Sequence, residues 1–184
     1  MSQRKQRSNN SSEITLDAAE RVAKNLGPGK VSLDSVAKEA GLTKGGVLYN
    51  FPSKTALIEG MLSRLIRTTS GLYEQSLEEV QGHPKAALVA NLKVAQGIND
   101  ISPQIPMAIL TGVAQKPDLL KPLREVLTER YQRMAAENAD SPEAEVMWLA
   151  AEGMQLLELL GIQPFTPERK EEIFAYLLEK GQAQ

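Results

Sequence analysis

The chain has 184 residues and a mass of 20.1 kDa, enough for one or two small domains with a sizeable core. It has no cysteine and one histidine, His83, which excludes disulfides and zinc–thiolate sites and argues against a histidine metal cluster or a Ser-His-Asp triad. Aromatic residues are scarce at 4%, which disfavours an all-β fold, and no apolar run approaches the roughly 20 residues of a membrane span. We therefore expect a soluble, cytoplasmic protein without a metal or cofactor.

The formal net charge of -2 is unevenly distributed along the chain. Residues 1–57 carry nine Lys and Arg against five Asp and Glu, a net charge of +4. Residues 58–184 carry twelve against eighteen, a net charge of -6. A basic head on an acidic body predicts that the head alone binds an anionic partner.

The first twelve residues, MSQRKQRSNNSS, are polar and hold three basic residues without an acid. This composition predicts a disordered basic arm over residues 1–12. Apolar residues then recur at helical spacing from Ile14 to Leu26, which predicts a helix closed by the Gly-Pro-Gly sequence at 27–29.

Two short helices are predicted next. Ser32 is placed to cap a helix that ends at Ala40, and Thr43 to cap a second helix that runs to about Asn50. Gly41 supplies the tight exit from the first helix, and small side chains around it allow the two helices to cross closely. This arrangement is a helix-turn-helix, which offers the N-terminal part of its second helix to the major groove of DNA.

Two features of this region favour DNA as the anionic partner. Gly45 and Gly46 lie inside the second helix, where each costs about 1 kcal/mol relative to Ala, so a group outside the helix is expected to compensate. Lys54 follows Ser53 at the start of the next helix, where a cation is mildly unfavourable. A phosphate there would be held by the helix N–H groups and the Lys54 ammonium together.

Residues 41–57, GLTKGGVLYNFPSKTAL, resemble the signature of the tetracycline-repressor (TetR) family of bacterial transcriptional regulators. The preceding VSLDSVAKEA continues the match, and the similarity covers roughly residues 13–62. The resemblance implies a dimeric repressor that a small molecule releases from its operator. The helical spacing and the proline breaks along the chain predict an all-α fold of about nine helices. With the resemblance, we expect a three-helix DNA-binding domain at 13–57 and a helical bundle for ligand binding and dimerisation at 58–184.

The resemblance also assigns DNA contacts along the head. The residues expected to contact DNA are Ser32, Thr43, Lys44, Gly45, Gly46, Leu48, Tyr49, Asn50 and Lys54. The helix starts contact phosphates, the Lys-Gly-Gly segment lies nearest the base edges, and the last three residues clamp the sugar–phosphate backbone. Leu48 stands where the family often has an aromatic residue and is placed to contact a thymine methyl group. Asn50 replaces the usual His but can still donate to a phosphate, and Phe51 is expected in the core.

The second half of the chain keeps a helical pattern. Residues 142–160 are apolar almost all round, so a helix there must be covered on more than one face. Together with a helix at 167–180 it is predicted to form a four-helix dimer interface, the alternative being the centre of a monomeric bundle. The residues expected at this interface are Met147, Ala151, Leu157, Phe174, Leu177 and Leu178.

A ligand pocket is expected where the helices pack imperfectly. The stretch 84–138 is a broken helical region with small and flexible side chains, which favours a cavity. The expected lining residues are Met107, Leu110, Trp148, Met154 and Phe165, each of which also suits an ordinary core. Glu152 and Glu158 either orient a cationic ligand or face solvent.

Three functions fit these patterns. The first is a repressor whose ligand favours a head spacing that no longer matches two half-sites. The second is a constitutive DNA-binding protein without an effector. The third is a helical enzyme or small-molecule carrier, for which the sequence offers no nucleophile–base pair and no phosphate-binding glycine loop. We expect no enzymatic activity, and the expected partners are operator DNA, a second copy of the chain and a small-molecule effector, with no membrane.

Overall fold

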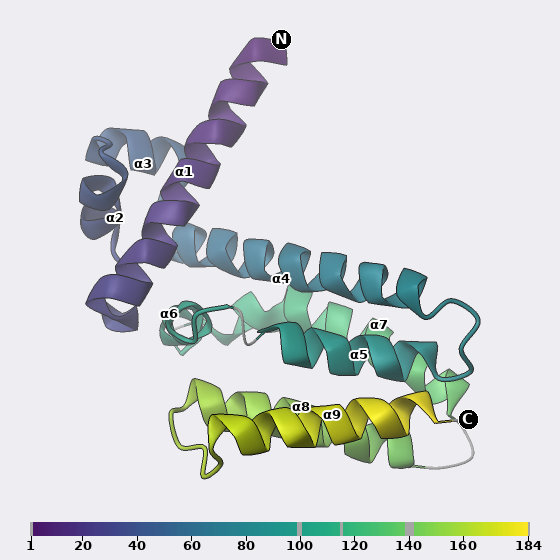
Figure 1. Cartoon of the computed structure of the whole chain (residues 1–184). Coiled ribbons are helices and arrows are strands. Elements are labelled where there is room, and N and C mark those ends of the chain that lie inside the picture. Colours follow the sequence, from purple (N-terminus) through teal and green to yellow (C-terminus); the bar gives the residue numbers. More distant parts are fainter. Residues whose placement is uncertain (1, 99–100, 115, 139–141, 184) are drawn as a thin grey trace. The chain divides into compact units, whose positions relative to one another are not determined.

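The computed structural model describes residues 2–98, 101–114, 116–138 and 142–183, and within these ranges it contains nine α-helices and no strand (Figure 1). The helices are α1 (Ser2–Leu26), α2 (Leu33–Ala40), α3 (Lys44–Asn50), α4 (Lys54–Glu79), α5 (Ala86–Gly97), α6 (Gln104–Val113), α7 (Lys121–Glu137), α8 (Glu143–Leu159) and α9 (Pro167–Gln182). Two short 3-10 turns, η1 (Pro28–Lys30) and η3 (Pro117–Leu120), complete the order. The predicted all-α fold class is confirmed.

The helices divide into two compact units. The first unit consists of residues 1–65 and 102–120, and the second of residues 66–101 and 121–184. Helix α4 therefore contributes its first half to one unit and its second half to the other. The sequence placed a boundary after residue 57 and gave everything beyond it to the second domain, whereas α6 packs with α1 and η1 in the first unit.

The core of the first unit lies where α1, α2, α3, α6 and the start of α4 meet. Two glycines permit close packing there. A Cβ atom on Gly60 would lie 2.5 Å from Cε1 of Phe51, and one on Gly112 would lie 2.8 Å from Cγ2 of Ile58. Phe51 is buried, as the sequence predicts. The packing of α1, α6 and the start of α4 thus holds α2 and α3 in place.

Helix α1 begins earlier than the sequence predicts. The expected disordered arm covered residues 1–12, but the helix extends back to Ser2. No glycine or proline occurs between Ser2 and Leu26, so no helix-breaking residue separates the apolar part of the helix from the polar residues before it.

The core of the second unit is built around α5, which packs against α7, α8 and α9. Most of α5 is buried, and the cluster it joins also holds Met134 of α7, Met147 of α8 and Phe174 of α9. In the described ranges, no helix has both the length and the apolar character needed to cross a membrane.

Candidate nucleic-acid interface

Helix α2 begins and ends as its sequence predicts. The Ser32 hydroxyl accepts a hydrogen bond from the Ser35 N–H at 3.1 Å, and the Ser35 hydroxyl accepts one from the Ser32 N–H at 3.0 Å. This reciprocal capping box fixes the start of the helix. Gly41 ends it with φ +65°, a left-handed conformation that favours glycine. The turn into α3 is therefore set by local chemistry.

Helix α3 places one face in the core and the other in solvent. Thr43 caps it by accepting a hydrogen bond from the Gly46 N–H at 3.1 Å, which leaves the threonine O–H able to donate to a phosphate. Val47 is fully buried, whereas Lys44 and Leu48 are exposed and Tyr49 is 71% exposed. The residues expected at base edges are thus on an accessible surface.

The two glycines of α3 are not required by packing within the chain. A Cβ atom on Gly45 would come no closer than 3.9 Å to Oγ1 of Thr43, and one on Gly46 no closer than 3.5 Å. Both are ordinary contacts, unlike the 2.5 Å approach at Gly60. The glycines are therefore not needed to make room for a neighbouring helix. Without side chains there, the backbone of α3 can be approached closely from outside.

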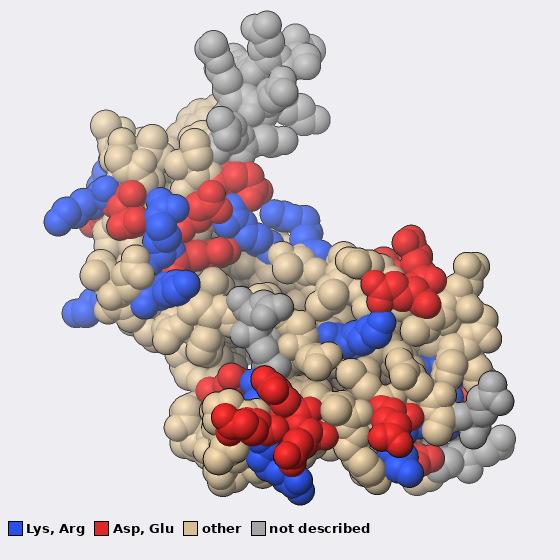
Figure 2. All heavy atoms as spheres, in the orientation of Figure 1, with Lys and Arg blue, Asp and Glu red and all other residues tan. Residues whose placement is uncertain are grey.

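Lys44 is paired in the free protein. Its Nζ lies 2.9 Å from Oδ1 of Asp34, and both side chains are more than half exposed. An ion pair so exposed contributes about 0–1 kcal/mol, so a phosphate or a base edge can replace it at low cost. Basic side chains, with acidic ones between them, project from the unit that holds α2 and α3 (Figure 2).

Asn50 contacts helix α1. Its side-chain amide donates to Oγ of Ser11 at 2.8 Å and more weakly to the Gly46 carbonyl at 3.4 Å. The side chain thus joins α3 to α1 in the free protein, where the sequence assigned it only a phosphate contact. Lys54 is exposed at the first position of α4, and Ser53 caps that helix by accepting from the Ala56 N–H at 3.1 Å.

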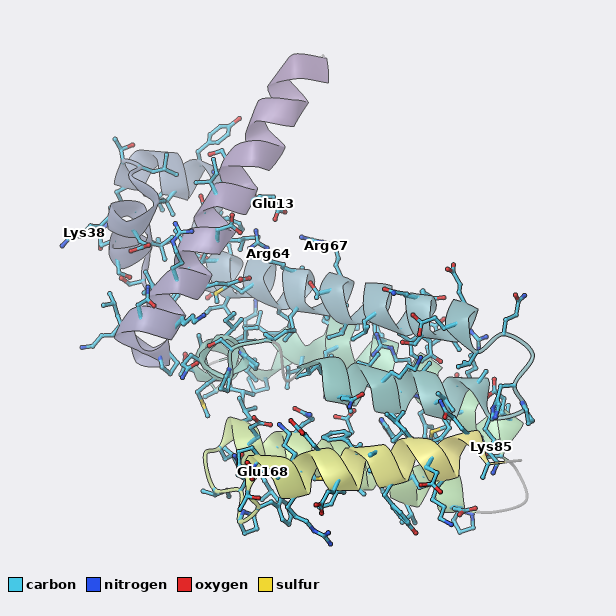
Figure 3. The ribbon with its side chains drawn as sticks, viewed as in Figure 1. Glu13, Lys38, Arg64, Arg67, Lys85 and Glu168 are labelled. Atoms are coloured by element: carbon cyan, nitrogen blue, oxygen red, sulfur yellow. The ribbon has the colours of Figure 1, made fainter. Side chains whose placement is uncertain are left out.

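Arg64 holds α1 against α4, and Figure 3 shows it reaching toward Glu13. Its guanidinium pairs with Glu13, with Asp17 at 2.6 Å and with Glu20 at 3.2 Å. Burial lowers the pKa of Arg64, but the hydrogen bonds to Glu13 and Asp17 and the charge of Glu20 together raise it above its ordinary value. The position of α1, against which α2 and α3 pack, is thus fixed by charge as well as by apolar contact.

The residues expected to line a pocket fall in different units. Met107 and Leu110 belong to the first unit, and the other three belong to the second. Met154 is buried in the core cluster, with Trp148 and Phe165 packed against it. These residues line neither of two cavities that described residues of the second unit form. One hollow of about 430 Å³ lies beside α4 and α5, and a smaller one of about 100 Å³ lies between α4 and α7.

The two glutamates considered for a cationic ligand have partners within the chain. Glu152 accepts a hydrogen bond from Nε1 of Trp148 at 3.2 Å, and burial raises the pKa of its carboxyl. Glu158 pairs with Lys170 of α9. Neither residue lines the cavities named above.

Two family models match the chain. The model for "Bacterial regulatory proteins, tetR family" matches residues 16–61, and "Tetracyclin repressor-like, C-terminal domain" matches residues 85–180. The chain belongs to the TetR family. The family places it in the general class of DNA-binding transcriptional regulators. The resemblance to this family seen in residues 41–57 is thus confirmed.

Solved structures agree with this TetR-type fold. A transcriptional regulator from Rhodococcus sp. Rha1 is 21% identical, with a TM-score of 0.73 over 92% of this chain and 94% of that one. A regulator from Streptomyces coelicolor A3(2) is 18% identical, with a TM-score of 0.60 over 95% and 99%. The multidrug binding protein EbrR, in complex with imidazole, is 20% identical, with a TM-score of 0.56 over 90% and 88%. No curated protein matches the chain.

The residues that the sequence assigned to a TetR-type dimer interface are mostly in the chain's own core. Four of them are buried there: Met147, Ala151, Phe174 and Leu177. The exposed apolar residues are their neighbours on α8 and α9 and in the turn after α8. The large apolar side chains of this region that are 48% to 62% exposed are Val146, Leu149, Leu156, Leu160, Ile162 and Tyr176. The all-round apolar character of 142–160 predicted a helix covered on more than one face, but helical spacing alone did not tell which face the chain itself covers.

Proposed function

We propose that the protein is a repressor that binds a palindromic operator as a homodimer and is released by a small-molecule effector. The observation that carries the proposal is the outer surface of α3, where an exposed lysine, two glycines that packing does not require and an exposed Tyr49 follow one another. Such a surface lets the backbone approach base edges while cationic and hydroxyl groups contact phosphates.

Within the head, the proposal keeps the contacts expected from the sequence. Thr43 donates to a phosphate, because it uses an oxygen lone pair for its cap and keeps a hydrogen to donate. The Ser32 hydroxyl shares a hydrogen bond of 2.9 Å with Oγ of Ser35 in the free protein, and it exchanges this partner for a phosphate. Lys44 exchanges Asp34 for DNA. Lys54 binds phosphate at the start of α4, where the helix N–H groups add their partial positive charge.

The dimer is proposed to form through the exposed apolar face of α8. Val146, Leu149, Leu156 and Leu160 follow one another at spacings of three, seven and four residues, which places them on one side of the helix. Gly153 lies between them with no atom within 4 Å of where its Cβ would be, so another helix can approach there. Two heads joined in this way can occupy half-sites about 34–36 Å apart.

The small-molecule effector is proposed to bind to the second unit. The protein is proposed to act as a regulator and not as an enzyme. EbrR, a protein of similar fold, has been crystallised with imidazole and with ethidium, so a fold of this kind accommodates small molecules. A cytoplasmic location follows from the proposed access to DNA.

Fluorescence anisotropy with the DNA upstream of the protein's own gene, at two salt concentrations and against a scrambled duplex, tests the DNA-binding part. We expect tight, salt-weakened but selective binding to the first duplex. Lys44→Ala should weaken it about tenfold without changing Tm, because the Asp34 pair is exposed. Asp34→Asn should strengthen it, since it removes both the competing partner and a negative charge near DNA.

The control is Lys121→Ala, which removes the same charge from an exposed position in the second unit. Equal loss in both variants would mean that binding responds only to net charge. Equal affinity for the two duplexes would contradict selective recognition at this sequence, and a genome-wide selection of bound fragments would then decide whether an operator exists elsewhere.

A further inference from the structure

The cavity of about 100 Å³ between α4 and α7 has charged groups at its rim and two buried polar side chains in its wall. Glu74, Glu129 and Arg133 are exposed at the rim. Tyr73 is 4% exposed and Arg130 is 7% exposed. All of these residues belong to the second unit, so the cavity lies within one compact body.

Arg130 is a buried cation without an ion-pair partner in the described part of the chain. Its guanidinium carbon lies 4.7 Å from the centre of the Tyr73 ring, and Nη2 donates to the Ser70 hydroxyl at 3.2 Å. No described carboxylate comes within 4.0 Å of it. Burial lowers the pKa of Arg130, and the charges of Glu152, Glu74 and Glu129 offset this effect only from a distance. A buried cation in this state gains strongly from an anion that enters the cavity.

Tyr73 adds a second unused polar group. Its hydroxyl is buried and has no hydrogen-bond partner among the described residues. Burial raises the pKa of this phenol, so it stays neutral and keeps its proton to donate. The cavity wall therefore presents a neutral O–H donor beside a guanidinium that has N–H donors to spare.

We propose that this cavity binds the carboxylate of a small organic acid, with Arg130 as its ion-pair partner and Tyr73 as a hydrogen-bond donor. On this measure about 10–15 Å³ is enough for one water, so about 100 Å³ has room for an acid group and a short apolar part. The carboxylates of Glu74 and Glu129 are exposed to solvent, which screens their repulsion. Arg130 also disfavours a cationic ligand at this position.

The test compares probes of equal shape and different charge on the full chain without DNA. Propionate is compared with propionamide and propylammonium, and benzoate with benzamide and benzylammonium, by thermal shift and ligand-observed NMR. Sodium sulfate at equal ionic strength is the control for a stabilising effect that any anion would have. We expect at least one of the two carboxylates to raise Tm by about 3 °C at roughly ten times its Kd, while its amide and ammonium counterparts do not.

Variants of the cavity wall locate the site. Arg130→Met should weaken carboxylate binding at least about tenfold and Tyr73→Phe about threefold, whereas Arg124→Met, at an exposed position of α7, should leave it unchanged. Arg130→Met should also raise the Tm of the free protein, because it removes a buried charge that lacks a close partner. If that variant does not fold, Tyr73→Phe and the charge series on the unaltered chain still decide.

Each remaining outcome overturns the proposal. These are a stronger effect of the ammonium probes, equal effects of acids and amides, an effect of sulfate equal to that of the carboxylates, no effect of any probe, or carboxylate binding that survives Arg130→Met. That the acid acts as the effector rests on the proposed function, and it is tested separately by adding the acid to the DNA complex. Binding without release of DNA would keep the site and contradict only its regulatory role.

Discussion

Glu152 is a carboxyl group held inside the second unit next to the only tryptophan of the chain. Burial raises its pKa from 4.5, although the hydrogen bond from Trp148 and the charge of Arg130 act in the opposite direction. The folded protein therefore holds a proton on Glu152 at pH values where the unfolded chain has already lost it. In that range, the stability contributed by this group falls as the pH rises.

This difference predicts the behaviour of Glu152→Gln. The amide keeps an oxygen that accepts from Trp148 but does not ionise, so the variant should match the original protein below about pH 4.5 and become more stable than it as the pH rises above that value. Urea unfolding at a series of pH values measures this. The exposed Glu125→Gln on α7 is the control and should run parallel to the original protein. A constant gap between Glu152→Gln and the original protein at all pH values would contradict the prediction.

At the scale of the helix, α3 combines low intrinsic stability with an open outer surface. It has seven residues, of which two are glycines that contact nothing closely inside the chain. A methyl group at either glycine would stabilise the helix by about 0.5–1 kcal/mol. The proposed function explains why the chain keeps glycines here, because a methyl group on the outer face would hold the backbone away from DNA.

Gly45→Ala should therefore raise Tm and lower operator affinity in the same molecule. We expect about 0.5–1 kcal/mol of added stability and about a tenfold loss of affinity, the size typical of forcing a methyl group into a packed contact. Gly60→Ala is the matched control inside the unit: its Cβ would clash with Phe51, so it should lose about 1–3 kcal/mol of stability. Unchanged operator affinity in Gly45→Ala would remove α3 from the closest contact with DNA.

The helices that could be predicted in detail are those whose ends are set by local chemistry. Ser32 and Thr43 set the starts of α2 and α3, and the left-handed Gly41 sets the end of α2. These residues lie close together in the chain, so the local sequence was sufficient to predict both helices. The position of α6 was not predictable, because it depends on Gly112 meeting Ile58, which is 54 residues away in the chain. Arg130 also gave no signal, since an arginine on a polar helix normally faces solvent.

At the scale of the whole molecule, the exposed apolar residues of α8 carry the proposed dimer. Leu149 and Leu156 are 61% and 53% exposed, on the same side of a helix whose other side is core. Scattered exposed leucines are ordinary in soluble proteins, but a continuous stripe along one helix is typical of a protein interface. The sequence predicted that this helix is covered on more than one face. The buried Met147 and Ala151 show which face packs against the rest of the chain.

The double variant Leu149→Glu with Leu156→Glu should therefore be monomeric while keeping its helices. Placing two charges in each half of the interface puts like charges together and removes the apolar area that holds the dimer. Sedimentation velocity measures the mass, and circular dichroism checks the fold. Operator affinity should fall by about 10²-fold or more, because one head then binds without the effective concentration supplied by the second. Leu26→Glu, at a position of α1 that is also 61% exposed, should stay dimeric. A double variant that remains a dimer would place the interface on another surface of the molecule.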